Sequence, residues 1–176
     1  WDTWLTDNLA NRLVRVDVAT KTIRDLTPGF EYLFTVSGEF SFEISPDGRS
    51  VAVTINSTPP PYAGYLNNDI YLVPTDGTGA RKNITPENKG DDSGAVFAPD
   101  GRSLVFRRQE TPYYNGEFQK LWRHDLASGK NTPVTDHLDY AIGEVAFSGD
   151  SKTIWITAED KGVVPIFRLN ADGRGL

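Results

Sequence analysis

The sequence predicts an all-β protein built from tandem four-stranded antiparallel units. Three observations favour this fold class. One turn sequence occurs three times, apolar and polar residues alternate in the segments beside that turn, and further strand-like segments follow each copy. No segment has the apolar spacing expected of a convincing helix.

The repeated turn is SPDGRSVAV from Ser45, APDGRSLVF from Ala98, and the more divergent SGDSKTIWI from Ser148. In the first copy Pro46 fixes φ at about −65°, Asp47 suits the second central position of the turn, and Gly48 can take the left-handed conformation. This combination predicts a type I turn with a G1 bulge, which joins two antiparallel strands. In the third copy Ser151 stands at the glycine position, at a cost of about 1–2 kcal/mol.

The strands can be assigned in chain order. Ahead of the first turn, TWLTD, RLVRVDVATK and TIRDLTP predict three strands. EFSFEIS and VAVTI flank the first turn, and DIYLVPTDG and RKNITP follow it. GAVF and LVFR flank the second turn, before KLWRHDLASGK and TPVTD, whereas EVAF and TIWIT flank the third, before PIFRLNADG. With the strands of one unit labelled A to D, and the turn between A and B, the chain reads BCD, ABCD, ABCD and ABC.

This organisation predicts a single partial β-propeller domain. The expected units are residues 1–33, 34–87, 88–137 and 138–176. A four-stranded unit of about 40–50 residues repeated in tandem is typical of a propeller blade. A β-sandwich also has many short strands, but it does not normally repeat one turn sequence at this spacing.

Composition excludes several classes of function. The net charge of −6 and the pI near 4.9 argue against binding to nucleic acid or to an anionic membrane surface. The chain lacks a run of about 18 apolar residues, which a membrane-spanning helix needs. It contains no Cys, so disulfides and thiolate chemistry are excluded and the cellular compartment stays open.

Several segments resemble known propellers. The PDG turns, DIYLVPTDG and NITP are similar to repeats of the periplasmic TolB-like proteins and of the prolyl oligopeptidase family of serine peptidases. FAPDGRSLVFRRQE, LWRHDLASGK and SKTIWITAEDKGVVPIFRLNADG are most similar to the acylaminoacyl-peptidase and dipeptidyl-peptidase-like branch of that family. The resemblance extends from about Leu5 to Gly173. It implies a propeller of seven or eight blades above an α/β-hydrolase domain, of which this chain supplies about half the ring.

The resemblance also implies where catalysis takes place. Peptide hydrolysis in that family needs a Ser in a G-x-S-x-G motif, followed by Asp and His. The sequence contains no G-x-S-x-G, so we expect this chain alone to be non-catalytic, with the hydrolase domain absent. His124 is expected on the surface or packed in a blade, and His137 lies in a loop, so neither suggests a catalytic role. Asp91 and Asp92 are expected in a solvated acidic loop, and we expect no metal and no cofactor.

The long connections predict a contact surface. Because successive strands are antiparallel, the A–B and C–D turns share one face, and the B–C and D–A connections share the other. Two B–C connections, 57–68 and 108–119, are long and carry Pro and two tyrosines each. Candidate contacts with a peptide or with the missing domain are Tyr62, Tyr65, Arg107, Arg108, Tyr113 and Tyr114. Alternatively, the tyrosines pack against their own blades and the arginines are ordinary surface residues.

Two functional hypotheses therefore stand. The first is a propeller segment of a serine peptidase, with a peptide substrate and the hydrolase domain of the same polypeptide as partners. The second is part of a TolB-like or other stand-alone interaction propeller with no enzyme attached. In both, an open half-ring leaves blade faces and strand edges uncovered, so self-association of the chain is expected.

Overall fold

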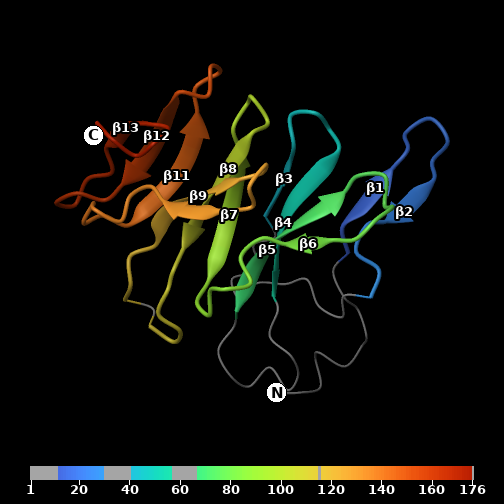
Figure 1. Cartoon of the computed structure of the whole chain (residues 1–176), viewed down its shortest axis with the longest axis horizontal. Helices are drawn as coiled ribbons and strands as arrows, with labels where there is room; N and C mark the ends of the chain where they lie inside the picture. The colour runs from blue at the N-terminus through green and yellow to red at the C-terminus, as the bar shows by residue number, and fades with distance from the viewer. Residues whose placement is uncertain (1–11, 30–40, 57–66, 115, 176) are drawn as a thin grey trace.

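The computed structural model describes residues 12–29, 41–56, 67–114 and 116–175, which form only strands, turns and loops (Figure 1). The first blade contains β1 (Val14–Val16) and β2 (Ile23–Asp25). The second contains β3 (Phe42–Ile44), β4 (Ser50–Asn56), β5 (Asn68–Pro74) and β6 (Lys82–Asn83). The third contains β7 (Asp92–Phe97), β8 (Ser103–Arg108), β9 (Lys120–Asp125) and β10 (Asn131–Pro133). The fourth contains β11 (Ile142–Phe147), β12 (Thr153–Ala158) and β13 (Ile166–Asn170).

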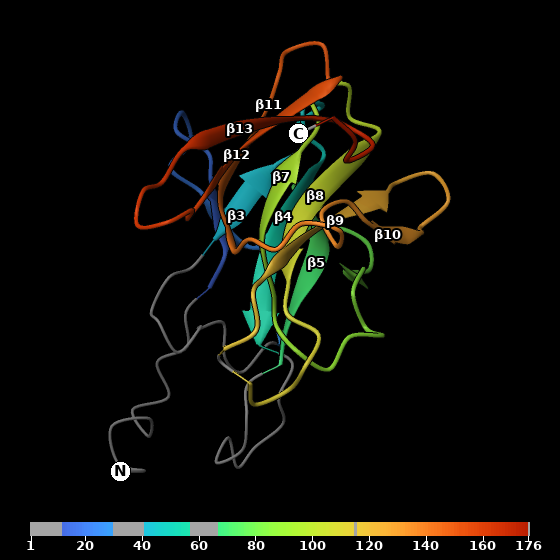
Figure 2. The same ribbon diagram turned by 90° about the vertical axis from the view of Figure 1, so that its left-hand side faces the viewer.

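Each blade is an antiparallel meander, and the blades follow one another in chain order. The strand orders are β3-β4-β5-β6, β7-β8-β9-β10 and β11-β12-β13, with β1 paired to β2. Strand β7 contacts β3, β4 and β5 of the preceding blade, and it also contacts β11 of the following one. Figures 1 and 2 show the blades arranged side by side as a partial ring. The predicted all-β partial propeller is confirmed, whereas the predicted strand at TWLTD lies outside the described residues.

The repeated turns have the predicted geometry. Gly48, Gly101 and Ser151 have φ values of 70°, 67° and 61°. In each turn the amide of this residue donates to the carbonyl three positions earlier, at 2.8–2.9 Å. The left-handed residue therefore closes the hairpin in all three copies, including the one without glycine.

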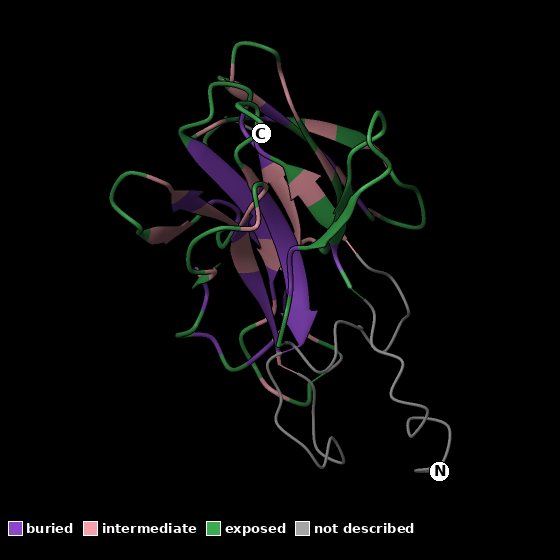
Figure 3. Cartoon of the chain, turned by 90° about the vertical axis from the view of Figure 1, so that its right-hand side faces the viewer, coloured by how far each residue is buried: buried purple, intermediate pink, exposed green. Residues whose placement is uncertain are grey.

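The hydrophobic core lies between the blades. Along β4, Val51, Val53 and Ile55 face the first blade, whereas Ala52 faces the third. The same alternation recurs one blade later, where Leu104 and Phe106 pack toward the second blade and Val105 packs toward the fourth. Each fully buried aliphatic side chain contributes about 1.5–3 kcal/mol. Figure 3 shows the result, a buried β4 beside the exposed β1–β2 pair.

Apolar surface is exposed on the fourth blade, and an apolar recess lies beside the first blade. Trp155 and Ile166, on the outer face of the fourth blade, are 44% and 70% exposed. Their register equivalents in the third blade, Val105 and Leu121, are fully buried against the fourth. At the other end, a recess of about 360 Å³ lies between the first and second blades. It is lined by Leu13, Val14, Arg15, Leu26, Phe42, Ile44, Gly48, Val51 and Thr75.

Candidate contact surface on the loop face

The described B–C and D–A connections gather on one side of the molecule, called here the loop face. In Figure 1 it is the lower side, and the A–B and C–D turns form the upper side, the turn face. The described part of the loop face includes the connector 84–91 between the second and third blades. It also includes the segment 109–119, without residue 115, which we call the tyrosine loop.

The tyrosine loop presents three aromatic side chains to solvent. Tyr113 and Tyr114 are 73% and 58% exposed, and Phe118 is 48% exposed. This exposure disfavours the alternative in which the two tyrosines pack against their own blade. Phe118 was not among the sequence candidates, which were the paired tyrosines and arginines, although it lies in the same segment. Tyr62 and Tyr65 lie outside the described residues.

Polar side chains within the tyrosine loop fix its shape. The Glu117 carboxylate accepts hydrogen bonds from the amides of Glu110 and Thr111, at 3.2 and 2.6 Å. The side-chain amide of Gln109 donates to the carbonyl oxygens of Thr111 and Tyr114, at 3.0 and 2.9 Å. Tyr113 itself is left-handed, with φ of 64°. The loop is therefore shaped by hydrogen bonds to its backbone, and its aromatic rings are exposed at the surface.

Arg108, at the end of β8, is not a surface residue. It is only 4% exposed, and its Nε donates to Asp92 Oδ1 at 2.7 Å. Its Nη2 donates to Glu87 Oε1 at 2.8 Å, and more weakly to Asp92 Oδ2 at 3.3 Å. The guanidinium carbon lies 4.4 Å from the centroid of the Trp122 ring. The expected surface position of Arg108 is wrong, and its Nε and Nη2 bind acidic side chains of this chain.

Arg107 is half-buried and joins two blades. Its Nη1 donates to the carbonyl oxygen of Gly143 in β11, at 3.0 Å. Its guanidinium also passes close to Gly94 of β7, where a Cβ atom would approach Arg107 Nη2 to 2.5 Å. Arg107 therefore connects the third blade with the fourth, and a role in binding a peptide stays a prediction.

The expectation of a solvated loop at Asp91 and Asp92 is also wrong. Asp92 is the first residue of β7 and is fully buried opposite Arg108. Burial raises its pKa to about 6, although hydrogen bonds and charge from Arg108 act in the opposite direction. Burial likewise raises the pKa of Asp91, against a hydrogen bond of 2.5 Å from Asn68 Nδ2. Two adjacent acidic residues are typical of a solvated turn. Only the strand pairing shows that Asp92 faces the buried Arg108.

A second set of contacts ties Glu87 to the outer strands. Asn131 Nδ2 donates to Glu87 Oε1 at 2.9 Å and to the carbonyl oxygen of Ile84 at 2.7 Å. His124 Nδ1 lies 2.7 Å from Asn131 Oδ1. His124 is 1% exposed in β9, so it packs within the blade, and burial lowers its pKa. His137 is exposed beside Asp136, at 3.7 Å.

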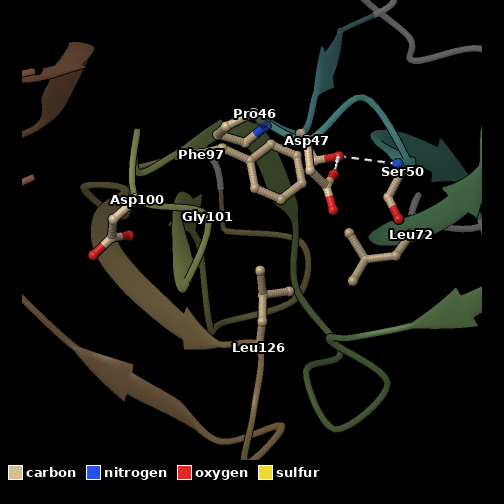
Figure 4. Close-up of a pocket in the computed structure, with 9 residues that line it drawn as sticks. Pro46, Asp47, Ser50, Leu72, Phe97, Asp100, Gly101 and Leu126 are labelled. Atoms are coloured by element: carbon tan, nitrogen blue, oxygen red, sulfur yellow. Dashed lines mark hydrogen bonds between the residues drawn. The ribbon is translucent and has the colours of Figure 1, made fainter.

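A hollow on the turn face offers less chemistry. It measures about 390 Å³ and lies between the second and third blades (Figure 4). Its lining is Ser45, Pro46, Asp47, Ser50, Leu72, Phe97, Asp100, Gly101 and Leu126. Both carboxylates are engaged by their own turns, because Asp47 accepts from Arg49 N and Asp100 accepts from Arg102 N, each at 3.0 Å. Among the residues that the structure describes, no group of three or more His, Cys, Asp or Glu side chains is placed to hold a metal ion.

Helices that could cross a membrane are likewise missing from residues 12–29, 41–56, 67–114 and 116–175.

Comparison with known proteins gives the following relatives. No family model matches the sequence. Dipeptidyl-peptidase 5 of Aspergillus fumigatus is 31% identical over 146 residues, which are 78% of this chain and 20% of that protein. Dipeptidyl-peptidase 5 of Porphyromonas gingivalis is 30% identical over 164 residues, which are 90% of this chain and 24% of that protein. The chain therefore spans a fifth to a quarter of the length of these relatives.

Solved structures show the same fold. TolB from Acinetobacter baumannii superposes with a TM-score of 0.64 at 21% identity, covering 92% of this chain and 35% of that one. A puromycin-hydrolyzing peptidase from Mycobacterium tuberculosis also gives 0.64, at 18% identity, covering 89% of this chain and 25% of that one. Together with the dipeptidyl-peptidase 5 sequences, these similarities confirm the resemblance found in the PDG turns and in the run from Thr153 to Gly173.

Proposed function

We propose that this chain is a non-catalytic propeller segment of a larger serine peptidase of the dipeptidyl-peptidase type. The share of its relatives that it matches supports this assignment, because it aligns with only 20–24% of each dipeptidyl-peptidase 5 protein. A propeller segment with no G-x-S-x-G motif would control access of the substrate and contact the catalytic domain. Peptide hydrolysis would take place in an α/β-hydrolase domain elsewhere in the polypeptide.

The loop face is the part of the segment that we assign to this contact. The observation that carries the assignment is the exposure of Tyr113, Tyr114 and Phe118 together on one ordered loop. Aromatic side chains are enriched at interfaces, where each buries a large area at a low cost in conformational entropy. The tyrosine loop would then pack on the hydrolase domain or border the path of the peptide.

A stand-alone interaction propeller is the second candidate. It is supported by the similarity to TolB, which matches 92% of this chain. In that case the tyrosine loop would bind a protein partner, and no serine nucleophile would be found in the full polypeptide.

Hydrolysis by the longer polypeptide that contains this segment tests the assignment. We expect that polypeptide to cleave chromogenic dipeptide substrates and to be labelled by a serine-directed fluorophosphonate, whereas the 176-residue chain does neither. A longer polypeptide that is neither active nor labelled would favour the stand-alone propeller. Turnover by the chain alone would contradict the proposal.

The same assay tests the role of the loop face. Tyr113→Ala combined with Tyr114→Ala removes two exposed rings, and we expect kcat/KM to fall by about tenfold, as for the loss of an interface hot spot. The control is Val18→Ala, a site that is 89% exposed in the β1–β2 turn on the turn face. An unchanged kcat/KM in the tyrosine variant, with labelling intact, would show that this loop contacts neither the substrate nor the catalytic domain.

A further inference from the structure

The ion pair between Asp92 and Arg108 occupies a pair of positions that is apolar in the fourth blade. Counted from the repeated turn, Arg108 corresponds to Ile55 in the second blade and to Ala158 in the fourth. Asp92 pairs with Arg108 across the β7–β8 ladder, whereas Ile142 pairs with Ala158 across the β11–β12 ladder. A buried ion pair at these positions therefore distinguishes the third blade from the fourth.

Stability does not explain the pair. Both residues are buried, at 0% and 4% exposure, so each gives up its hydration. Replacing a buried ion pair by apolar residues of similar volume is often neutral or stabilising. Ile142 and Ala158 occupy the same two positions in the fourth blade, which shows that this fold accepts apolar residues there. The segments that the ion pair holds in place offer another explanation.

A chain of hydrogen bonds runs from the ion pair to the tyrosine loop. Asn88 Nδ2 donates both to Asp92 Oδ2, at 3.1 Å, and to the carbonyl oxygen of Gln109, at 2.9 Å. The backbone of Gln109 pairs with Asp91 in both directions, at 2.8 and 3.1 Å. The side chain of Gln109 then donates to the carbonyl oxygen of Tyr114. Two side chains, those of Asn88 and Gln109, thus link the buried carboxylate to the backbone of the exposed Tyr114.

The connector between the blades is fastened at the same place. Glu87 and Asn88 both belong to it, and they bind the two members of the ion pair, Glu87 to Arg108 and Asn88 to Asp92. Gly90 lies directly against the Gln109 carbonyl, so closely that a Cβ atom there would overlap it. The connector and the first residue of the tyrosine loop therefore form one packed unit around the ion pair.

We propose that Arg108 is a positioning residue, which through Asp92 and Glu87 holds the connector 84–91 and the tyrosine loop in one fixed arrangement. The aromatic surface of the loop face is then presented in a single shape. What this surface contacts rests on the proposed function, but the positioning itself belongs to this chain and can be measured without any partner.

Hydrogen exchange in the 176-residue chain tests the proposal. The key variant is Asp92→Ile with Arg108→Ile, which installs the residues that the chain already uses at these positions, Ile142 and Ile55. It leaves no buried charge unpaired, because Glu87 is half exposed and keeps Asn131. We expect amides of residues 109–114 and 116–119 to exchange about tenfold faster, while the central amides of β4 and β8 keep their protection. Arg174→Ala, which breaks the exposed pair with Asp172, is the control and should leave the loop unchanged.

Two further variants separate positioning from folding. Arg108→Ile alone leaves Asp92 buried without its partner, and we expect exchange to increase throughout the third blade. Asp92→Asn keeps the shape of the side chain, so it serves if the double variant does not fold, and loop exchange must rise in it as well. Wild-type exchange of the tyrosine loop in a folded double variant, or in a folded Asp92→Asn variant, would overturn the proposal. Because the readout is exchange in the chain alone, this outcome is independent of whether the longer polypeptide is a peptidase.

Discussion

Asp92 carries the ionisation that the fold perturbs most clearly. Its pKa lies near 6 because burial disfavours the carboxylate, and the nearby charge of Asp69 adds to the effect. Arg108 and Asn88 act in the opposite direction but do not cancel the burial. A carboxyl group with a raised pKa binds its proton more tightly in the folded state than in the unfolded chain.

The pH dependence of stability follows from this. Asp92 contributes stability that is fully present below its ordinary pKa of 3.8 and is lost as the pH rises through about 6. We expect the free energy of unfolding of the wild type to fall by about 2–3 kcal/mol between pH 4 and pH 7, relative to Asp92→Asn. Urea unfolding of both proteins across this range measures the difference, and Arg108 and Glu87 are present in both. A difference that does not change with pH would mean that Asp92 stays ionised throughout.

Ser151 shows how a departure from the repeat is accommodated. Its left-handed backbone costs about 1–2 kcal/mol relative to glycine. Its Oγ accepts a hydrogen bond of 2.9 Å from the amide of Asp100, in the turn of the neighbouring blade. Gly101, at the equivalent place in the preceding pair of blades, has no side chain to make such a contact, and the hollow of the turn face lies there. The strained residue thus connects two turns that glycine would leave apart.

The individual strands and turns were predictable because their signals are local. PDG fixes the A–B turn through the dihedral preferences of three adjacent residues, and short apolar, β-branched runs predict the buried strands β4 and β8. The roles of Asp92, Arg108 and Phe118 depend on partners far along the chain or on exposure in a loop. No local pattern distinguishes a buried acid in β7 from a solvated one, so these roles required the structure.

The turn after β13 is an element whose position depends on close packing. Gly173 is left-handed, with φ of 83°, and a Cβ atom there would overlap the carbonyl oxygen of Val134 in the third blade. Gly48 is also left-handed, with φ of 70°, but a Cβ atom there would meet nothing within 4 Å. Substitution of Gly48 therefore tests backbone strain alone, whereas substitution of Gly173 tests backbone strain together with steric overlap.

Alanine at these two sites should have different effects. Gly48→Ala adds only the strain of a left-handed residue, about 1–2 kcal/mol. Gly173→Ala adds the same strain and also pushes the turn away from the third blade, so we expect a loss of about 3 kcal/mol or more in the free energy of unfolding. Chemical denaturation of the two variants measures the difference. Equal losses would show that the β13 turn can move away from Val134 at no cost.

At the scale of the whole molecule, stability is built from contacts between neighbouring blades. Each hydrophobic cluster joins adjacent blades, and each inner blade uses one side of its sheet for each neighbour. An arrangement of this kind is stabilised by a sum of nearest-neighbour interfaces. In the described part of the chain, the fourth blade therefore keeps an exposed apolar outer face, as Trp155 and Ile166 show.

We expect the 176-residue chain to self-associate. The outer face of the fourth blade of one copy would pack on the recess between the first and second blades of another. Sedimentation velocity at micromolar concentration should show dimers or larger species, because exposed apolar sheet faces recruit partners. Trp155→Glu combined with Ile166→Glu should shift the distribution to monomer, whereas Val18→Glu, in the exposed β1–β2 turn, should not. A wild-type chain that sediments as a monomer would contradict this expectation.

The buried ion pair has a consequence for folding fidelity. Tandem repeats of similar sequence can exchange equivalent strands during folding, either within one chain or between chains. If β7 took the place of β3 beside β4, Asp92 would face Ile55 and lose its guanidinium partner. An unpaired buried charge costs about 3–5 kcal/mol, which is enough to reject that pairing. Asp92 and Arg108 therefore favour the pairing of β7 with β8 over the pairing of β7 with β4.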